Sequence, residues 1–141
     1  MDSAEHERPP RQLLAAVAAW WAAAVLTAVQ VAAMWTDRDV LVGGLVAQGA
    51  SPQEAESRAQ QVMALNTAVD AFLVLLYFAM SLLIYRRRPW ARNVLTAFGL
   101  VHVIMTMAVG VSNLLLLGLL VLALVLTWWP TSGKWIAGEH G

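Results

Sequence analysis

The sequence predicts an all-α fold, an integral membrane four-helix bundle with an extracytoplasmic helical hairpin between its first and second transmembrane helices. Its 141 residues are 60% hydrophobic and only 13% charged, with a mean hydropathy of +0.63, whereas an average soluble domain is about one quarter charged. The apolar residues gather in four long runs, and seven of the nine basic residues flank these runs on one side. A chain this short cannot bury so much apolar surface by itself, so we expect its solvent to be a bilayer.

The first two predicted spans are residues 13–35 and 67–85. The first run has 23 residues, with Gln30 as its only strongly polar member. It makes a helix of about 34 Å, which is long enough to cross a bilayer with some tilt. Because this run is long and ends in bulky residues, it is interpreted as a retained helix and not as a cleaved signal peptide. The second run carries Asp70 near its outer end and stops at three consecutive arginines, residues 86–88.

Residues 36–66 form the one long connection outside the predicted bilayer. The first half of this connection is apolar and follows Thr36 and Asp37, either of which is expected to cap a short helix. Gly49 is expected to end that helix, because glycine readily adopts the left-handed conformation found after helix C-termini.

A second helix of the connection is predicted to begin at Ser51. Ser51 is a suitable N-cap, Pro52 suits the first helical position, and Glu54 completes a capping box. No helix breaker lies between Pro52 and Tyr85, so the sequence allows one continuous helix of about 50 Å that projects past the outer leaflet. The connection is interpreted either as a helical hairpin that caps the bundle or as a surface that docks a partner.

The last two predicted spans, residues 90–109 and 114–129, form an antiparallel pair. Only residues 110–113 separate them, and so short a connection joins antiparallel neighbours. The fourth run ends in a Trp-Trp-Pro sequence at residues 128–130, which is typical of a membrane interface and of a helix end.

The distribution of basic residues predicts the orientation in the membrane. Only Arg38 and Arg58 lie between spans one and two. The opposite side carries Arg8, Arg11, Arg86, Arg87, Arg88, Arg92 and Lys134. Short basic segments stay in the cytoplasm, so the N-terminal tail (1–12) and the C-terminal tail (130–141) are both expected there, in a multi-pass protein of the cell (inner) membrane whose transmembrane domain is 13–129. The same basic residues are expected to bind anionic lipid headgroups, at about 1 kcal/mol each near the surface.

The sequence lacks the residues that several classes of chemistry require. There is no cysteine, which excludes disulfides, thiol redox chemistry and thiolate metal sites. The sequence has no His-Glu-x-x-His, no glycine-rich phosphate loop and no nucleophile elbow, and a lone histidine with one aspartate supplies too few metal ligands. Its formal net charge of zero gives no indication of nucleic-acid binding. We therefore expect no catalytic residue, no cofactor, no metal site and no nucleic-acid partner.

Four polar residues inside the spans are candidates for a site: Gln30, Asp70, His102 and Thr106. Counting along each span places all four in the outer half of the bilayer, and His102 and Thr106 share one helix face because they are four residues apart. Polar groups are costly in lipid, so we expect Asp70 to face the bundle and find His102, Thr106 or Gln30, or else to be protonated. The cluster is interpreted either as a set of interhelical hydrogen bonds or as a path for protons.

The turn between spans two and three carries a further pattern. Three arginines at 86–88 and then Pro89 are followed by Trp90, Ala91 and Arg92. With the leading Arg and Pro segment and the acidic connection, this pattern resembles a group of small four-helix membrane proteins common in actinobacteria, whose hallmark is a basic turn followed by Trp-Ala-Arg. Those proteins have no assigned activity, so the resemblance implies a topology and a source but no reaction. From the chemistry of the side chains alone, we expect Trp90 to be an interfacial anchor and Arg92 to contact a lipid headgroup or a loop.

Two classes of function compete. In the first, the chain is an accessory or structural membrane protein that binds other membrane proteins, or a second copy of itself, through its outer hairpin or the alanine-rich face of its first span. In the second, it is an oligomeric small-solute or proton-coupled transporter or channel that uses the polar cluster around Asp70 and His102. The first class is favoured, because a transporter of this size is expected to carry a charge near the middle of a span, and Asp70 lies nearer the outer end.

Overall fold

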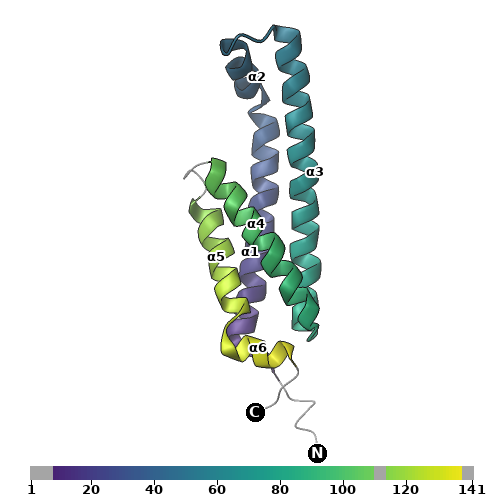
Figure 1. Cartoon of the computed structure of the whole chain (residues 1–141), viewed down its shortest axis with the longest axis vertical. Helices are drawn as coiled ribbons and strands as arrows, with labels where there is room; N and C mark the ends of the chain where they lie inside the picture. The colour runs from purple at the N-terminus through teal and green to yellow at the C-terminus, as the bar shows by residue number, and fades with distance from the viewer. Residues whose placement is uncertain (1–7, 110–113, 138–141) are drawn as a thin grey trace, which may run out of the picture.

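The computed structural model describes residues 8–109 and 114–137, and these residues fold into α-helices without a strand. The helices, shown in Figure 1, are α1 (Arg11–Thr36), α2 (Arg38–Ala47), α3 (Pro52–Tyr85), α4 (Pro89–Val109), α5 (Leu114–Thr127) and α6 (Pro130–Ile136). The predicted short turn at 110–113 and the outermost parts of the two predicted tails, 1–7 and 138–141, lie outside the described residues. The predicted all-α class is confirmed for the residues described.

Three of these helices, α1, α3 and α4, are long and apolar enough to cross a membrane. Helices α5 and α6 together meet the same criterion, but they meet at an angle of 64°. The described chain therefore has three helices of this kind, or four if the bent pair makes one crossing. Helices α1 and α4 cover the predicted runs 13–35 and 90–109, and α3 contains the predicted run 67–85.

The fourth apolar run forms a shorter helix than the sequence indicates. Helix α5 ends at Thr127, two residues before the predicted end at 129. Trp129 has an extended backbone, with φ −61° and ψ 142°, because the residue before a proline is sterically driven out of the helical region. Pro130 then starts α6, a helix that the sequence analysis did not predict. At 14 residues, α5 alone is about 21 Å long, less than the hydrocarbon thickness of about 30 Å.

The outer connection contains the two predicted helices. Neither of the proposed caps bonds to α2: Asp37 makes no side-chain capping bond, and the Thr36 hydroxyl donates instead to the carbonyl of Ala32 within α1. Gly49 follows the end of α2 with a φ of 104°, as predicted from the conformational freedom of glycine. Ser51 caps α3 through a bond from the Glu54 N–H to its hydroxyl, at 3.2 Å.

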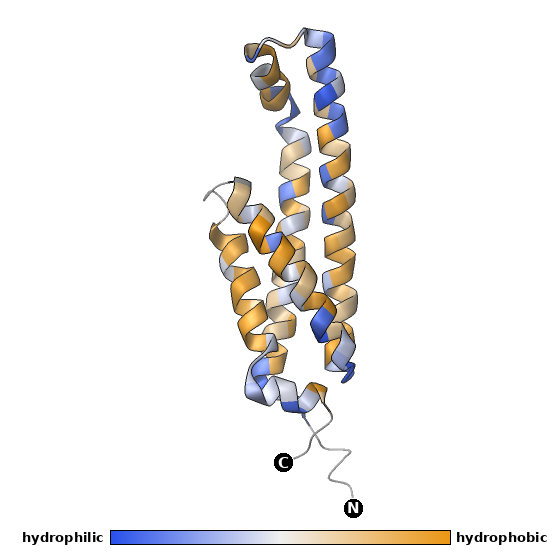
Figure 2. Ribbon diagram, viewed as in Figure 1, coloured by the Kyte–Doolittle hydropathy of each residue, from blue (hydrophilic) through white to orange (hydrophobic). Residues whose placement is uncertain are grey.

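Helix α3 is continuous over 34 residues, which is the unbroken helix that the sequence allows. At about 51 Å it is much longer than the hydrocarbon core of a bilayer. In Figure 1, α1 and α3 extend well beyond the pair formed by α4 and α5, with α2 at the far end. Figure 2 shows that the first turns of α3 are hydrophilic and that most of its remaining length is hydrophobic. We call α2 together with residues 52–66 of α3 the outer arm.

Helix α1 is the central element of the packing. It lies against α3 and α5, while α4 contacts α3 and α5 from the other side. The alanine-rich part of α1 divides between the core and the surface: Ala19 and Ala23 are buried, whereas Ala15, Ala18 and Ala22 are exposed. The small alanine side chains let the neighbouring helices approach α1 closely on its buried side.

Candidate functional site

The four polar residues predicted from the spans line one pocket of about 250 Å³ between α1, α3, α4 and α5. Gln30 comes from α1, Asp70 from α3, and His102 and Thr106 from adjacent turns of α4. Asn66, one turn before Asp70 on α3, adds an amide that the sequence analysis missed. Its place was detectable, because residues four apart on a helix share a face. The pocket therefore gathers a carboxylate, two amides, an imidazole and a hydroxyl.

Hydrogen bonds inside this polar pocket differ from the pairs expected. The Nδ1 atom of His102 lies 2.6 Å from the hydroxyl of Tyr77. The rings of these two residues also stack on one another. The Thr106 hydroxyl donates to the backbone carbonyl of His102 at 2.8 Å. Tyr77 was not among the predicted residues, although it lies two turns from Asp70 on α3 and so shares its face. Among the described residues, Asp70 makes no hydrogen bond or ion pair with the groups around it.

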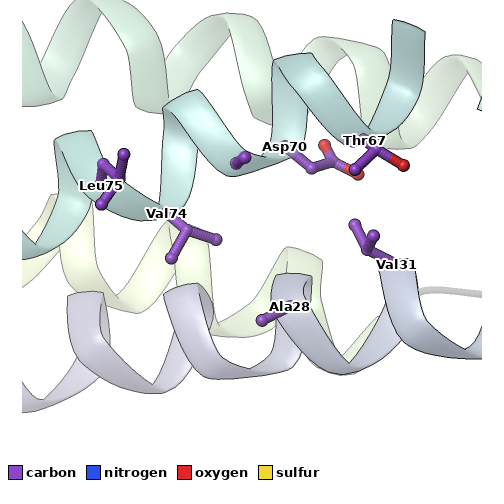
Figure 3. Close-up of a pocket in the computed structure, with 7 residues that line it drawn as sticks. Ala28, Val31, Thr67, Asp70, Val74 and Leu75 are labelled. Carbon is purple, nitrogen blue, oxygen red and sulfur yellow. The ribbon is translucent and has the colours of Figure 1, made fainter. Parts of the chain in front are cut away.

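Asp70 also borders a second pocket, a groove of about 340 Å³ between α1 and α3. Figure 3 shows its carboxylate beside Thr67 on α3, with Val31 and Ala28 on the opposite helix. Apart from Asp70 and Thr67, the lining of this groove is aliphatic. The Thr67 hydroxyl is already engaged, since it donates to the Met63 carbonyl and accepts from the Trp35 indole. Asp70 thus stands at the boundary between a polar pocket and an apolar groove.

Packed side chains separate the polar pocket from the basic end of the molecule, which is formed by the start of α1, the α3–α4 turn and α6. Trp20, Tyr77, Leu95 and Leu120 are fully buried, and each lies farther along its helix toward the basic end than the pocket residues do. The Trp20 and Tyr77 rings pack at a centroid distance of 4.9 Å. Protein interiors packed in this way hold few voids large enough for water. Two members of this layer carry polar groups that are engaged in hydrogen bonds, since the Tyr77 hydroxyl pairs with His102 and the Trp20 indole donates to Thr127.

The basic turn between α3 and α4 packs against the C-terminal segment. The Arg87 guanidinium lies 3.9 Å from the ring centre of Trp135, and the Arg92 guanidinium lies 4.0 Å from that of Trp128. These distances are those of cation–π interactions. Of the residues predicted to meet lipid headgroups, Arg87 and Arg92 therefore contact tryptophans of their own chain, whereas the side chains of Arg86, Arg88 and Trp90 are exposed.

Tryptophan N–H groups connect neighbouring segments along the whole molecule. The bonds run from Trp20 to Thr127 (2.9 Å), from Trp21 to Ser81 (2.8 Å), from Trp35 to Thr67 (2.8 Å), from Trp128 to Thr96 (2.7 Å) and from Trp135 to the Tyr85 carbonyl (3.0 Å). Each of the four hydroxyls in turn donates to a carbonyl three or four residues earlier in its own helix. The sequence analysis identified none of these pairs, because the two members are far apart in the chain.

These observations define a helical protein with three to four helices suited to crossing a membrane, a polar pocket between them and an arm beyond them. The residues described include no group of three or more side chains placed to hold a metal ion. No protein-family model, curated protein or solved structure matches the chain. The resemblance to small actinobacterial four-helix proteins stays a prediction.

Proposed function

We propose that this chain is a four-span accessory protein of the cell membrane that binds other membrane proteins, with both termini in the cytoplasm and the outer arm outside. Charge supports the orientation. Within the described residues, the end of the molecule formed by the start of α1, the α3–α4 turn and α6 carries basic side chains and no acidic one. Its exposed basic residues, Arg8, Arg11, Arg86, Arg88 and Lys134, would meet anionic lipid headgroups.

The observation that carries this proposal is the exposure of α2. This helix has an almost wholly apolar sequence, yet none of its residues is buried. Val40 is 75% exposed, and in the proposed orientation α2 faces water and not lipid. Val46 is exposed as well, while Leu41, Val42 and Leu45 are half-buried. Apolar side chains exposed together on a water-facing element are typical of a protein interface. The hydrophilic first turns of α3 beside it supply a polar rim of the kind that borders interfaces.

Site-specific photo-crosslinking in native membranes tests the proposal. A photoreactive residue at Val40 should yield a discrete product that contains another membrane protein, identified by mass spectrometry. The same residue at Glu56, an exposed polar position of the outer arm, is the matched control and should give little of this product. A product containing two copies of this chain would indicate self-association. Equal products from both positions, or none from Val40, would contradict the proposal.

The alternative function is proton-coupled or small-solute transport by an oligomer, and the polar pocket is the observation that favours it. It places Asp70 and His102 in one cavity, as relays in transporters do. The layer of Trp20, Tyr77, Leu95 and Leu120 favours the accessory function instead, because these four side chains are fully buried and lie between the pocket and the basic end of the molecule.

Proton flux into liposomes that contain the purified protein separates the two functions. A transporter should show flux that both Asp70→Asn and Asp70→Leu abolish, since neither side chain exchanges a proton at this position. The accessory function predicts no flux above that of empty liposomes.

A further inference from the structure

Asp70 is a carboxylate without a cationic partner among the residues that the structure describes. It lies 15 residues before Tyr85 on α3, which places it about 22 Å from the inner end of that helix and within the outer third of a bilayer about 30 Å thick. Ionisable groups at membrane depth are costly unless they pair with another group or line an aqueous cavity. Among the described residues no lysine or arginine approaches Asp70 closely enough to form an ion pair.

The groove beside Asp70 has the shape that a helix needs for close approach. Two of its lining residues, Ala28 on α1 and Ala71 on α3, are exposed alanines on facing helices. Small residues at such positions let the backbone of a third helix come near. Leu75, 69% exposed, continues the groove toward the membrane centre. An incoming apolar helix would therefore pack along α1 and α3 with Asp70 at its side.

Charge decides what kind of helix fits. An apolar surface with one carboxylate is complementary to an apolar helix with one basic residue. A second copy of this chain cannot supply that residue, because its own spans carry no lysine or arginine near the depth of Asp70. The nearest basic residues along the long axis are Arg38, seven residues beyond Val31, and Arg58, 12 residues before Asp70. They lie about 10 Å and 18 Å farther out than Asp70.

We propose that the groove between α1 and α3 docks a transmembrane helix of a different protein, one that carries a lysine or arginine at the depth of Asp70. This inference rests on the proposed accessory function and specifies the chemistry of the partner. The polar pocket behind Asp70, with Asn66 and Gln30 in its wall, would solvate the pair. Docking of this kind joins two chains only when both are in the same membrane.

Synthetic transmembrane peptides test the inference. The probe is a leucine and alanine helix with a single lysine 15 residues from its inner flanking arginines, which matches the depth of Asp70. Two control peptides carry the lysine near the inner end or replace it with leucine. Binding is measured in lipid bicelles at neutral pH by energy transfer from a labelled peptide to the full chain labelled at Thr131→Cys, since the chain has no cysteine of its own. The depth-matched peptide should bind at least about tenfold more tightly than either control.

Variants of the chain locate the binding. Asp70→Asn keeps the shape of the side chain but removes the charge, and it should abolish the advantage of the depth-matched peptide. Ala28→Leu fills the groove without changing any charge and should weaken binding by at least about tenfold. Ala22→Leu is the matched control, because Ala22 is also an exposed alanine of α1 but lines a different groove, and it should bind like the parent. Thermal unfolding of each variant checks that it remains folded.

The outcomes distinguish this inference from the function on which it rests. Equal binding of the three peptides, or undiminished lysine-dependent binding by Asp70→Asn, would overturn the docking groove. If a partner crosslinked from Val40 remains bound by Asp70→Asn and Ala28→Leu, the groove is wrong while the accessory function stands. If the depth-matched peptide binds as expected but no partner is crosslinked from Val40, the groove stands and the outer arm loses its role.

Discussion

At the scale of single residues, serine and threonine hydroxyls link neighbouring segments because each donates one hydrogen bond and accepts another. A hydroxyl can donate one hydrogen bond and accept others. Here Thr127 donates to the Ala123 carbonyl at 2.6 Å and accepts the Trp20 indole N–H at 2.9 Å. Both groups lie where water is excluded, since Trp20 and Thr127 are fully buried. The pair thereby satisfies two polar groups that would otherwise be costly to bury.

A double-mutant cycle should measure the contribution of this bond. Trp20→Phe and Thr127→Val each remove one partner, and each should lower the free energy of unfolding in detergent. If the hydrogen bond contributes to stability, the double variant should lose less free energy of unfolding than the sum of the two single losses. We expect the difference to be about 0.5–1.5 kcal/mol. The same cycle for Trp128 and Thr96, an exposed pair, should show a smaller coupling. Strict additivity at Trp20 and Thr127 would show that the bond adds no stability.

A glycine in α4 makes room for the same tryptophan. A Cβ atom added at Gly99 would lie 2.8 Å from the Trp20 ring and 3.3 Å from Leu124. We expect Gly99→Ala to lower the free energy of unfolding by about 1–3 kcal/mol, because the buried ring has little freedom to move. Gly118→Ala is the control, as nothing lies within 4 Å of its added Cβ, and its helix propensity should improve. Thermal unfolding followed by circular dichroism measures both variants, and equal midpoints would contradict the expected clash.

At the scale of elements, the residues at the helix ends determine where one helix stops and the next begins. Ser51 and Pro52 start α3 well before its apolar region, so the helix continues unbroken from its polar first turns into its apolar part. Pro130 starts α6 directly after the fourth apolar run, and α6 is bent by 64° from the direction of α5. Helix α6 therefore lies across the basic end of the molecule (Figure 1). There Trp135 contacts Arg87 of the α3–α4 turn, and Trp128 contacts Arg92 of the first turn of α4. The turn and the start of α4 are therefore attached to the C-terminal segment by one aromatic contact each.

The N-cap of α3 provides the test at this scale. Ser51→Ala removes the acceptor for the Glu54 N–H, and it should cost about 1 kcal/mol, confined to the first turn of α3. Hydrogen exchange of the amides in that turn should accelerate, while amides near Tyr77 keep their rates. Ser57→Ala, at an exposed position of the same helix, is the control. Unchanged exchange in Ser51→Ala would mean that the cap does not stabilise the start of α3.

At the scale of the whole molecule, polarity divides along the long axis. The outer arm holds acidic residues and an exposed apolar helix, the middle holds the apolar helices and the polar pocket, and the opposite end holds most of the basic residues. A bilayer favours one placement of such a molecule, because the hydrophobic segments must lie in lipid and short basic segments stay in the cytoplasm.

Cysteine labelling in intact cells tests this placement. A single cysteine at Glu56, on the outer arm, should react with an impermeant maleimide. One at Thr131, at the exposed start of α6, should react only after the cells are opened. The parent chain has no cysteine, so labelling reports the introduced residue alone. The reverse pattern would overturn the orientation drawn from the basic residues.

The features that could be predicted from the sequence are local in character. The apolar runs located α1, α3 and α4, and Ser51 with Pro52 located the start of the long helix, because helix formation and capping depend on residues within a few positions of one another. Helical spacing also placed His102 and Thr106 on one face. The pocket shared with Gln30 and Asp70 followed from the cost of polar groups in lipid.

The pairing of side chains from different helices could not be predicted in this way. Tyr77 and His102 are 25 positions apart, and Trp20 and Thr127 are 107 positions apart. Their contact depends on how far each helix rotates and tilts against its neighbours, which the packing of the whole core sets. The same packing leaves Asp70 without an ion-pair partner among residues 8–109 and 114–137 and opens the α1–α3 groove beside it. Local sequence contains no information about these rotations, so the groove and the paired side chains emerged only from the fold.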